Sequence, residues 1–457
     1  MKTFVADLRL LARSRFSVAA LVLLLILASL AVLAGLSAVA RQNATIDRVA
    51  IAHRQDLAAV AAEYGKPDGE AGRAAYYTFH LTSDRPSDLA FAALGQRDIQ
   101  PYVLRVRLLG LQAQLYESEV INPELALPGP FDFAFVLIYL APLIVIALMH
   151  DLVTGEREAG RLRLLASLPS RPGGLWLRRA GLRYGLGLLA LLLPLAVGGV
   201  VAGAAPAGIA ALGLIAALYL AFWFGLSLLV AAGGKTSAGV ATALVGCWIV
   251  LTLLIPAAAN AAIARAIPVA RGVDLTLAQR EAVHHAWDVP KDDIFRPFFV
   301  KRPEWRDTPP VTGRFHWKWY YAMHEMGDDA VAPQLVEYRD ALANRQAATS
   351  ALSWVSPAAA VQTLTHRIAD TDLAAHLAWQ DNIVAFHDRL KDFYYPYLFE
   401  ERPFDRPDFA ALPTWQPRPG TESLPASPLI ALTLLMLVAI GAGVLVSSGP
   451  RNVDREL

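Results

Sequence analysis

The chain has 457 residues, of which 55% are hydrophobic and only 18% are charged. Soluble globular proteins carry roughly 25% charged residues, so this composition argues against an ordinary soluble enzyme and favours a membrane protein. The 41 lysine and arginine residues nearly balance the 40 acidic ones, which gives no reason to expect nucleic acid or an acidic protein as a partner. The single cysteine, Cys247, excludes an internal disulfide and a cysteine-based metal cluster.

Residues 1–15 form a short amphipathic segment at the start of the chain. Phe4, Leu8 and Leu11 recur with helical spacing, while Arg9 lies on the other side. This pattern predicts an interfacial helix on the cytoplasmic leaflet of the membrane. The alternative is a short cytoplasmic extension of the first membrane span.

Six apolar stretches have the length of about 20 helical residues that is needed to cross the hydrocarbon core of a bilayer. We predict spans at residues 16–38, 131–149, 183–203, 207–231, 238–263 and 428–447. The first stretch exceeds the roughly 7–15 apolar residues of a signal peptide, so we expect it to be retained. The spans hold almost no ionisable side chain at membrane depth, unlike proton pumps and ion-coupled transporters. We therefore expect no energy source within the membrane.

The basic residues predict which polar segments lie in the cytoplasm. Short segments rich in lysine and arginine stay on that side of a membrane, and here they are the N-terminal segment, residues 150–182, the turn at Lys235 and the tail at residues 448–457. The chain is therefore predicted to be a multi-pass protein of the bacterial inner membrane with both termini in the cytoplasm.

Two long polar regions, residues 39–130 and 264–426, fall on the opposite side in this topology. Both are predicted to be mainly helical extracytoplasmic domains. Helical spacing is expected at residues 46–64 and 103–116 in the first region and at residues 336–398 in the second. The predicted fold class is thus an all-α polytopic membrane protein with two outer domains.

The link between the second and third spans, residues 150–182, changes from charged to apolar along its length. A helix here would present a charged side to water and an apolar side to another surface. Pro169 and the sequence Pro172-Gly173-Gly174 would then end the helix and return the chain to the membrane. The alternative is a solvated loop that only follows the positive-inside rule.

This link resembles the intracellular coupling segment of ABC-2-type permeases, which are the membrane subunits of type-2 ATP-binding-cassette exporters. An acidic pair, a glycine, a leucine pair and a Ser/Pro-Ser-Arg exit carry the resemblance: Glu156, Glu158, Gly160, Leu164, Leu165, Ser167, Pro169, Ser170 and Arg171. Arg161 replaces the threonine that usually follows the glycine in that family. The order of the predicted elements is also similar, with the coupling segment after the second span and a large outer region before the last.

The resemblance implies that ATP hydrolysis and transport are carried out by different subunits. A separate ATPase would bind ATP and magnesium, so this chain would hold no cofactor and would not itself be an enzyme. The residues implied to contact the ATPase are Glu156, Glu158, Gly160, Arg161, Leu164, Leu165, Pro169 and Arg171. A second permease, either an identical chain or a paralogue, would complete a dimer surrounded by lipid.

Three functions remain open at this point. The first is export or extraction of a substrate from the cytoplasm or the inner membrane. The second is an ATPase-driven machine that remodels or assembles a periplasmic protein without transporting a solute. The third is a membrane-anchored assembly scaffold that needs no nucleotide.

The sequence GGKTS at residues 233–237 invites comparison with a nucleotide-binding P-loop. That motif requires a glycine six residues before its lysine, and this position is occupied by Leu229. The segment also lies between two apolar spans instead of after a soluble strand. We therefore interpret Lys235 as marking a cytoplasmic turn.

The second outer region is rich in aromatic residues and histidines. We expect the aromatic residues to form a core or to anchor at lipid headgroups, with ligand binding as the alternative. His324-Glu325 lacks the second histidine of a zinc-protease helix, and no cysteine or methionine-rich run favours copper. We therefore predict no metal site. Residues 352–399 resemble an uncharacterised domain of permeases linked with multicopper-enzyme maturation, including nitrous-oxide reductase assembly.

Overall fold

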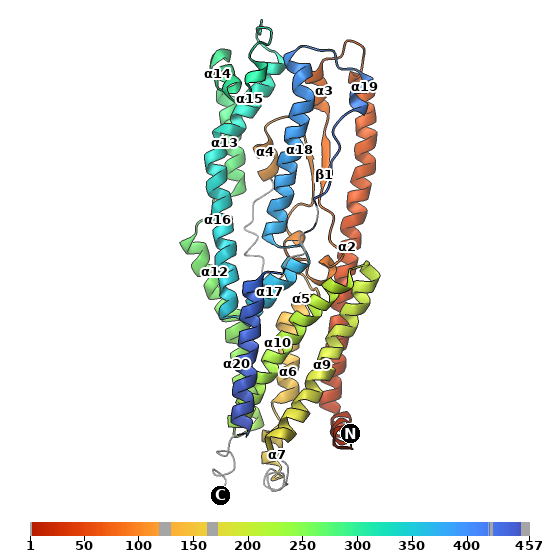
Figure 1. Cartoon of the computed structure of the whole chain (residues 1–457), viewed down its shortest axis with the longest axis vertical. Helices are drawn as coiled ribbons and strands as arrows, with labels where there is room; N and C mark the ends of the chain where they lie inside the picture. Colours follow the sequence, from red (N-terminus) through yellow and green to blue (C-terminus); the bar gives the residue numbers. More distant parts are fainter. Residues whose placement is uncertain (1, 118–128, 162–171, 419, 421–423, 449–457) are drawn as a thin grey trace.

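The computed structural model describes residues 2–117, 129–161, 172–418, 420 and 424–448. The protein is an elongated bundle whose helices run mostly along one long axis (Figure 1). Helix α1 (Lys2–Arg13) and the last turns of α20 (Ala426–Ser448) lie at the same end of the bundle, which we call the terminal end. The opposite half, beyond the apolar spans, is called the distal part.

Six helices of the described residues are long and apolar enough to cross a membrane. They are α2 (Arg15–Tyr64), Phe133–Glu158, Gly174–Ala202 within α9 (Pro172–Ala202), α10 (Pro206–Gly233), Ser237–Ala266 and Ala426–Ser447 within α20. Each overlaps one predicted span. The protein is therefore an all-α, multi-pass membrane protein.

Two helices differ in length from the predicted spans. The first span was placed at residues 16–38, but α2 continues for 50 residues into the distal part, because it contains no proline and only one glycine, Gly35. Helix α9 begins at Pro172, so residues 172–182 belong to the third span helix instead of to the link before it. Proline is favoured at the first position of a helix, where no backbone donor is needed.

The second and fifth spans are each interrupted by a π-helical segment just before a proline. The second runs through α5 (Phe133–Phe135), the π-segment Val136–Leu140, α6 (Ala141–Met149) and α7 (Thr154–Glu158). The fifth runs through α11 (Ser237–Trp248), the π-segment Ile249–Leu254 and α12 (Ile255–Ala266).

Side chains from other helices satisfy carbonyl groups in these two π-segments. Pro142 and Pro256 follow the segments and lack the backbone N–H that would bond to the preceding turn. The Tyr219 hydroxyl donates to the Ile138 carbonyl oxygen at 2.9 Å, and the Ser356 hydroxyl donates to that of Leu251 at 3.0 Å. The helical breaks are therefore fixed by neighbouring helices.

The distal part is built from short helices and one small sheet. In chain order these elements are α3 (Ala71–Tyr77), β1 (His80–Ser83), the 3-10 turns Ala90–Ala92 and Gly95–Asp98, β2 (Val103–Val106), α4 (Leu111–Tyr116), α13 (Gly272–His285), α14 (Lys291–Lys301), the 3-10 turn Pro303–Trp305, α15 (Trp317–Ala330), α16 (Ala332–Ala351), the 3-10 turn Leu352–Trp354, α17 (Pro357–Ile368), α18 (Leu373–Phe399) and α19 (Arg406–Ala410).

Residues 103–116 were expected to be helical, and this was wrong for the first eight, because helix α4 begins only at Leu111. Val103–Val106 forms the strand β2, which pairs antiparallel with β1 so that His80 lies opposite Val106. Two β-branched valines suit a strand, and the pairing partner lies more than 20 residues away, beyond the reach of a local pattern.

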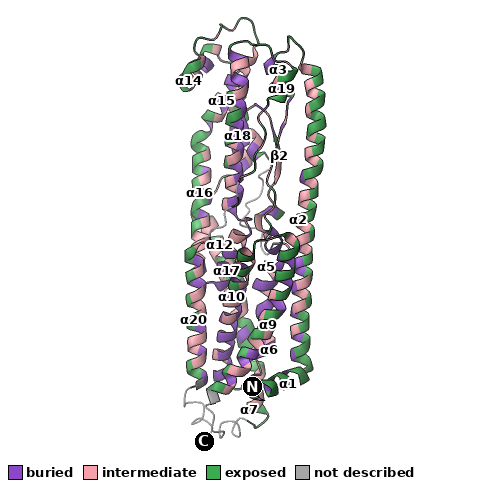
Figure 2. Ribbon diagram, turned by 45° about the vertical axis from the view of Figure 1, so that its right-hand side comes forward, coloured by how far each residue is buried: buried purple, intermediate pink, exposed green. Residues whose placement is uncertain are grey.

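Two hydrophobic cores divide the molecule, and Figure 2 shows the buried residues along the inner faces of both halves. The membrane core includes Tyr219 and Trp223, and Val361 of α17 joins it from outside the spans. The distal core is largely aromatic, with Tyr321 and Trp379 almost fully buried. The aromatic residues of the second outer region thus contribute mainly to a core.

Helices α10 and α20 approach most closely at glycines. A Cβ atom at Gly225 would lie 2.6 Å from the backbone nitrogen of Ile440, and one at Gly443 would lie 2.7 Å from the Gly225 carbonyl oxygen. Small residues let helix backbones pack closely in a membrane, where dispersion replaces the hydrophobic effect as the attraction. This contact places the last span against the fourth.

Candidate functional site

The short helix α7 at the terminal end carries the described part of the predicted ATPase-contacting segment. It ends at Glu158, and Gly160, two residues later, has a φ of +69° in the left-handed region that favours glycine. The backbone N–H of Arg161 donates to the Glu156 carbonyl oxygen at 2.9 Å across this turn. Gly160 therefore reverses the chain directly after the two acidic residues of the site.

Glu158 lies against the first turn of the fifth span. Its carboxylate accepts hydrogen bonds from the backbone nitrogen of Ser237 at 2.7 Å and from the Ser237 hydroxyl at 2.9 Å. Ser237 is the first residue of α11, so the negative charge lies at a helix N-terminus, where the helix dipole favours it. The contact joins the ends of the second and fifth spans.

Two further contacts hold α7 against the same turn. The Thr154 hydroxyl lies 2.9 Å from that of Ser237, and Arg157 donates to the Gly234 carbonyl oxygen. A Cβ atom at Gly234 would lie 2.1 Å from Cγ2 of Val240, so the turn has no room for a side chain there. The GGKTS sequence, excluded above as a P-loop, is thus the surface on which α7 docks.

Glu156 connects α7 to α9 and α1 through ion pairs. Its carboxylate lies 2.6 Å from Nε of Arg161 and 3.0 Å from Nη1 of Arg179. Arg179 also pairs with Asp7 of α1 at 3.4 Å, and Arg178 pairs with the same carboxylate. Asp7 is only 6% exposed, so these charges are better shielded from salt than a free surface pair.

The predicted site residues therefore divide into two groups. Glu156, Glu158, Gly160 and Arg161 lie together at the terminal end. The others lie outside the described residues: Leu164, Leu165, Pro169 and Arg171, with Ser167 and Ser170 of the same motif.

Sequence reasoning missed the partners of the acidic pair. Asp7, Arg179 and Ser237 are more than 20 residues away from α7 along the chain, beyond the reach of a local pattern. One signal was available: Asp7 is the only acidic residue of α1, and an isolated acid among basic residues close to a membrane suggests a fixed partner.

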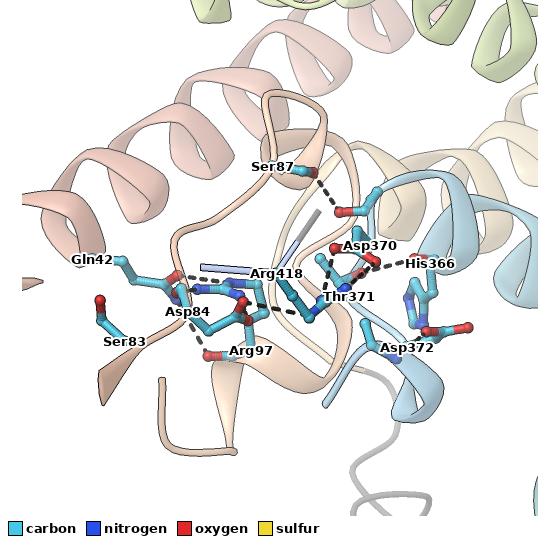
Figure 3. A network of polar contacts seen from close by, with 12 residues as sticks. Gln42, Ser83, Asp84, Ser87, Arg97, His366, Asp370, Thr371, Asp372 and Arg418 are labelled. Carbon is cyan, nitrogen blue, oxygen red and sulfur yellow. Dashed lines mark hydrogen bonds and ion pairs between the residues drawn. The ribbon is translucent and has the colours of Figure 1, made fainter. Parts of the chain in front are cut away.

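A second polar network lies where the spans meet the distal part (Figure 3). Arg97 donates from Nε to Gln42 of α2 at 3.1 Å and pairs with Asp84 through Nη1. Arg418, from the segment that leads into α20, pairs with Asp370 at 2.8 Å. Asp370 adopts a φ of +54°, which aspartate tolerates better than most residues.

Backbone contacts reinforce this junction. The Thr371 hydroxyl donates to the Ala93 carbonyl oxygen at 2.8 Å, and the Ser87 hydroxyl donates to that of Ala369 at 2.6 Å. The turn between α17 and α18 is thereby tied to the 3-10 turns that lie against α2 (Figure 3). These contacts thus join segments that are far apart in the sequence, at the distal end of the apolar spans.

The two networks consist of ion pairs and hydrogen bonds between elements that are far apart in the sequence. No group of three or more histidine, cysteine or acidic side chains is placed to hold a metal ion among residues 2–117, 129–161 and 172–418. The arrangement can transmit a displacement of α7 to α1, α9 and α11 at the terminal end, and it joins α2, α17 and the start of α20 at the junction.

Comparison with known proteins adds one finding. A family model described as a domain of unknown function, DUF3526, matches residues 274–418. This range runs from α13 to the segment before α20, so it covers residues 352–399 and leaves α7 and its contacts outside. No curated protein and no solved structure matches the chain.

Proposed function

We propose that this chain is the permease subunit of an ATP-binding-cassette exporter of the bacterial inner membrane. It moves or extracts a substrate out of the cytoplasm or the membrane, and a separate subunit hydrolyses ATP with magnesium. It works as a dimer with a second permease, either identical or a paralogue, and both termini lie in the cytoplasm. No nucleic acid takes part.

The observation that carries this proposal is the attachment of α7 to two span helices, α9 and α11, and through α9 to α1. Glu158 bonds to the start of α11, and Glu156 pairs with Arg179 of α9, which pairs in turn with Asp7 of α1. A partner that pushes on α7 would move these helices together, because each contact is charge-assisted and holds its geometry. A solvated loop without a role would not need such contacts.

The test is the composition of the complex. The tagged full-length protein is purified from membranes in mild detergent, and its bound proteins are identified by mass spectrometry. We expect an ATP-binding-cassette subunit in a reproducible ratio to the permease, and its loss when Glu156 and Glu158 are both replaced by alanine. Repeated purification without such a subunit, from cells that express the neighbouring genes, would contradict the proposal and favour the scaffold.

A second candidate is an ATPase-driven machine that remodels a periplasmic protein without transporting a solute. Helix α2 favours it, because one uninterrupted helix of 50 residues runs from the terminal end into the distal part. A stiff helix transmits motion over its whole length. Transport of a solute into sealed vesicles by the purified complex would support the first candidate, and binding of a periplasmic protein that depends on ATP hydrolysis would support the second.

A further inference from the structure

A cavity of about 280 Å³ lies in the distal part, away from both polar networks. Its walls come from the segment between β2 and α4, from α4 itself, from α13 and from α15. A single water occupies roughly 30 Å³ in the liquid, so the space is large enough for a small organic molecule. The residues on which the argument rests are Arg107, Gly110, Glu117, Gln279, Arg280 and His324.

Two polar side chains that line this cavity have buried nitrogen atoms without a hydrogen-bond partner among the described residues. Gln279 is 2% exposed, and its amide nitrogen donates to no described group. Both ring nitrogens of His324 are likewise buried and unpartnered. A buried donor without an acceptor costs about 1–3 kcal/mol, so such groups at a cavity wall indicate that something else completes them.

A glycine makes room for one of these groups. A Cβ atom at Gly110 would lie 1.9 Å from the amide nitrogen of Gln279. Any other residue at position 110 would displace that amide from its place at the wall. The sequence thus leaves space for a buried amide group that no described protein atom satisfies.

The cavity also holds a cation without a described acidic partner. The Arg107 guanidinium lies over the rings of Phe79 and Tyr76, at 4.9 and 5.4 Å from their centroids, and it forms no ion pair with the acids of the described ranges. Arg105 of β2, two residues earlier in the chain, also lies over Phe79 but pairs with Asp56 at 2.8 Å and does not line the cavity.

Other charged side chains near the cavity form ion pairs or hydrogen bonds with protein groups. Arg280 pairs with Glu117 at 2.7 Å. Asp328, one turn after His324, accepts from the backbone nitrogens of Leu111 and Gln112 at the start of α4. Burial, helped by the nearby Arg107, lowers the pKa of His324 to about 4, so this imidazole is neutral at pH 7. Of the two arginines that line the cavity, Arg107 is therefore the one without an acidic partner among the described residues.

We propose that this cavity binds the carboxylate of a small organic acid. Arg107 forms the ion pair, and the Gln279 amide and one ring nitrogen of His324 donate hydrogen bonds. One guanidinium without an acidic partner and two neutral donors suit the single charge of a carboxylate better than the two charges of a phosphate dianion. The site does not depend on the proposed export function.

The experiment compares acids with their neutral amides. The full-length protein in detergent is titrated at pH 7.5 and constant ionic strength with acetate, propionate or benzoate, and with acetamide, propionamide or benzamide, and binding is followed by saturation-transfer NMR. We expect at least one acid to bind and its amide to bind at least about tenfold more weakly. Equal binding of acid and amide, or no binding of any acid up to about 10 mM, would overturn the proposal.

Three variants locate the site. Arg107→Gln is expected to weaken acid binding at least about tenfold, while Arg107→Lys keeps part of it because the charge remains. The matched control, Arg105→Gln, removes the paired arginine over the same ring and is expected to change binding less than about twofold. Unchanged binding in Arg107→Gln, or an equal loss in Arg105→Gln, would place the acid elsewhere. A thermal unfolding curve for each variant confirms that it is folded.

Discussion

The carboxylate of Glu158 accepts two hydrogen bonds from Ser237, one from its backbone nitrogen at 2.7 Å and one from its hydroxyl at 2.9 Å. These residues are 79 positions apart, at the ends of the second and fifth spans. The pair therefore couples the short helix α7 to a span with which it shares no local sequence.

The hydrogen bonds between Glu158 and Ser237 predict that substitutions of these two residues have non-additive effects on ATP hydrolysis. If the proposed ATPase subunit binds α7, Glu158→Ala and Ser237→Ala are each expected to lower substrate-stimulated ATP hydrolysis by the complex. The double variant should be little worse than Glu158→Ala, because the hydroxyl bond that Ser237→Ala removes is already lost with the carboxylate. Hydrolysis rates in proteoliposomes measure this effect, with Glu63→Ala in the distal part as the control. Additive losses would show that the two residues act separately.

The close contact between α10 and α20 predicts that Gly225 does not tolerate a larger residue. Gly225→Ala would place a methyl group 2.6 Å from the backbone nitrogen of Ile440, and backbone cannot move aside as a side chain can. We expect a loss of about 1–3 kcal/mol in stability, measured by thermal unfolding in detergent. Gly441→Ala, at a position with no atom within 4 Å of the added carbon, should be neutral. Equal effects would argue against close packing of the two helices.

The junction predicts that two ion pairs of the same region differ in their contribution to stability. Asp84→Asn leaves Arg97, whose side chain is 6% exposed, without its anionic partner, and we expect a loss of about 3 kcal/mol. Asp47→Asn removes the partner of Arg85, where both side chains are more than half exposed, and should cost no more than about 1 kcal/mol. Chemical denaturation measures both values. Similar losses would mean that water reaches the Arg97 pair.

Glu325 in the distal core predicts a pH-dependent stability. Burial alone raises the pKa of Glu325, but Lys391, the Tyr395 hydroxyl, Lys301 and Arg302 outweigh burial and lower that pKa to about 2. A carboxyl group whose pKa is lowered by folding stabilises the protein above its unfolded pKa near 4.5, and this contribution is lost as the pH falls towards 2. The ionised group contributes up to about 3 kcal/mol at pH 7.

Glu325→Gln is therefore expected to lower the melting temperature at pH 7, and the difference from the parent protein should shrink below pH 4.5. Thermal unfolding at several pH values measures this difference. Glu337→Gln, at an exposed position of α16, should have no such effect. A difference that stays constant down to the lowest pH would show that the effect comes from packing and not from charge.

The sequence by itself determined the class of this protein and most of its helices. Six apolar stretches of sufficient length require a multi-pass helical protein, because backbone groups in a bilayer must be satisfied within each helix. The helical spacing of residues 46–64 was likewise correct, since α2 extends to Tyr64. These properties depend on local composition, which can be read along the chain.

Only the tertiary structure decided which distant groups meet. Local pattern could not assign Val103–Val106 to a strand, because the pairing strand lies at His80–Ser83. It could not reveal that Glu158 caps α11. Nor could it distinguish Arg105, which has an acidic partner, from Arg107, which has none among the described residues. Charge pairing depends on distances between side chains in space, and these follow from how the helices pack.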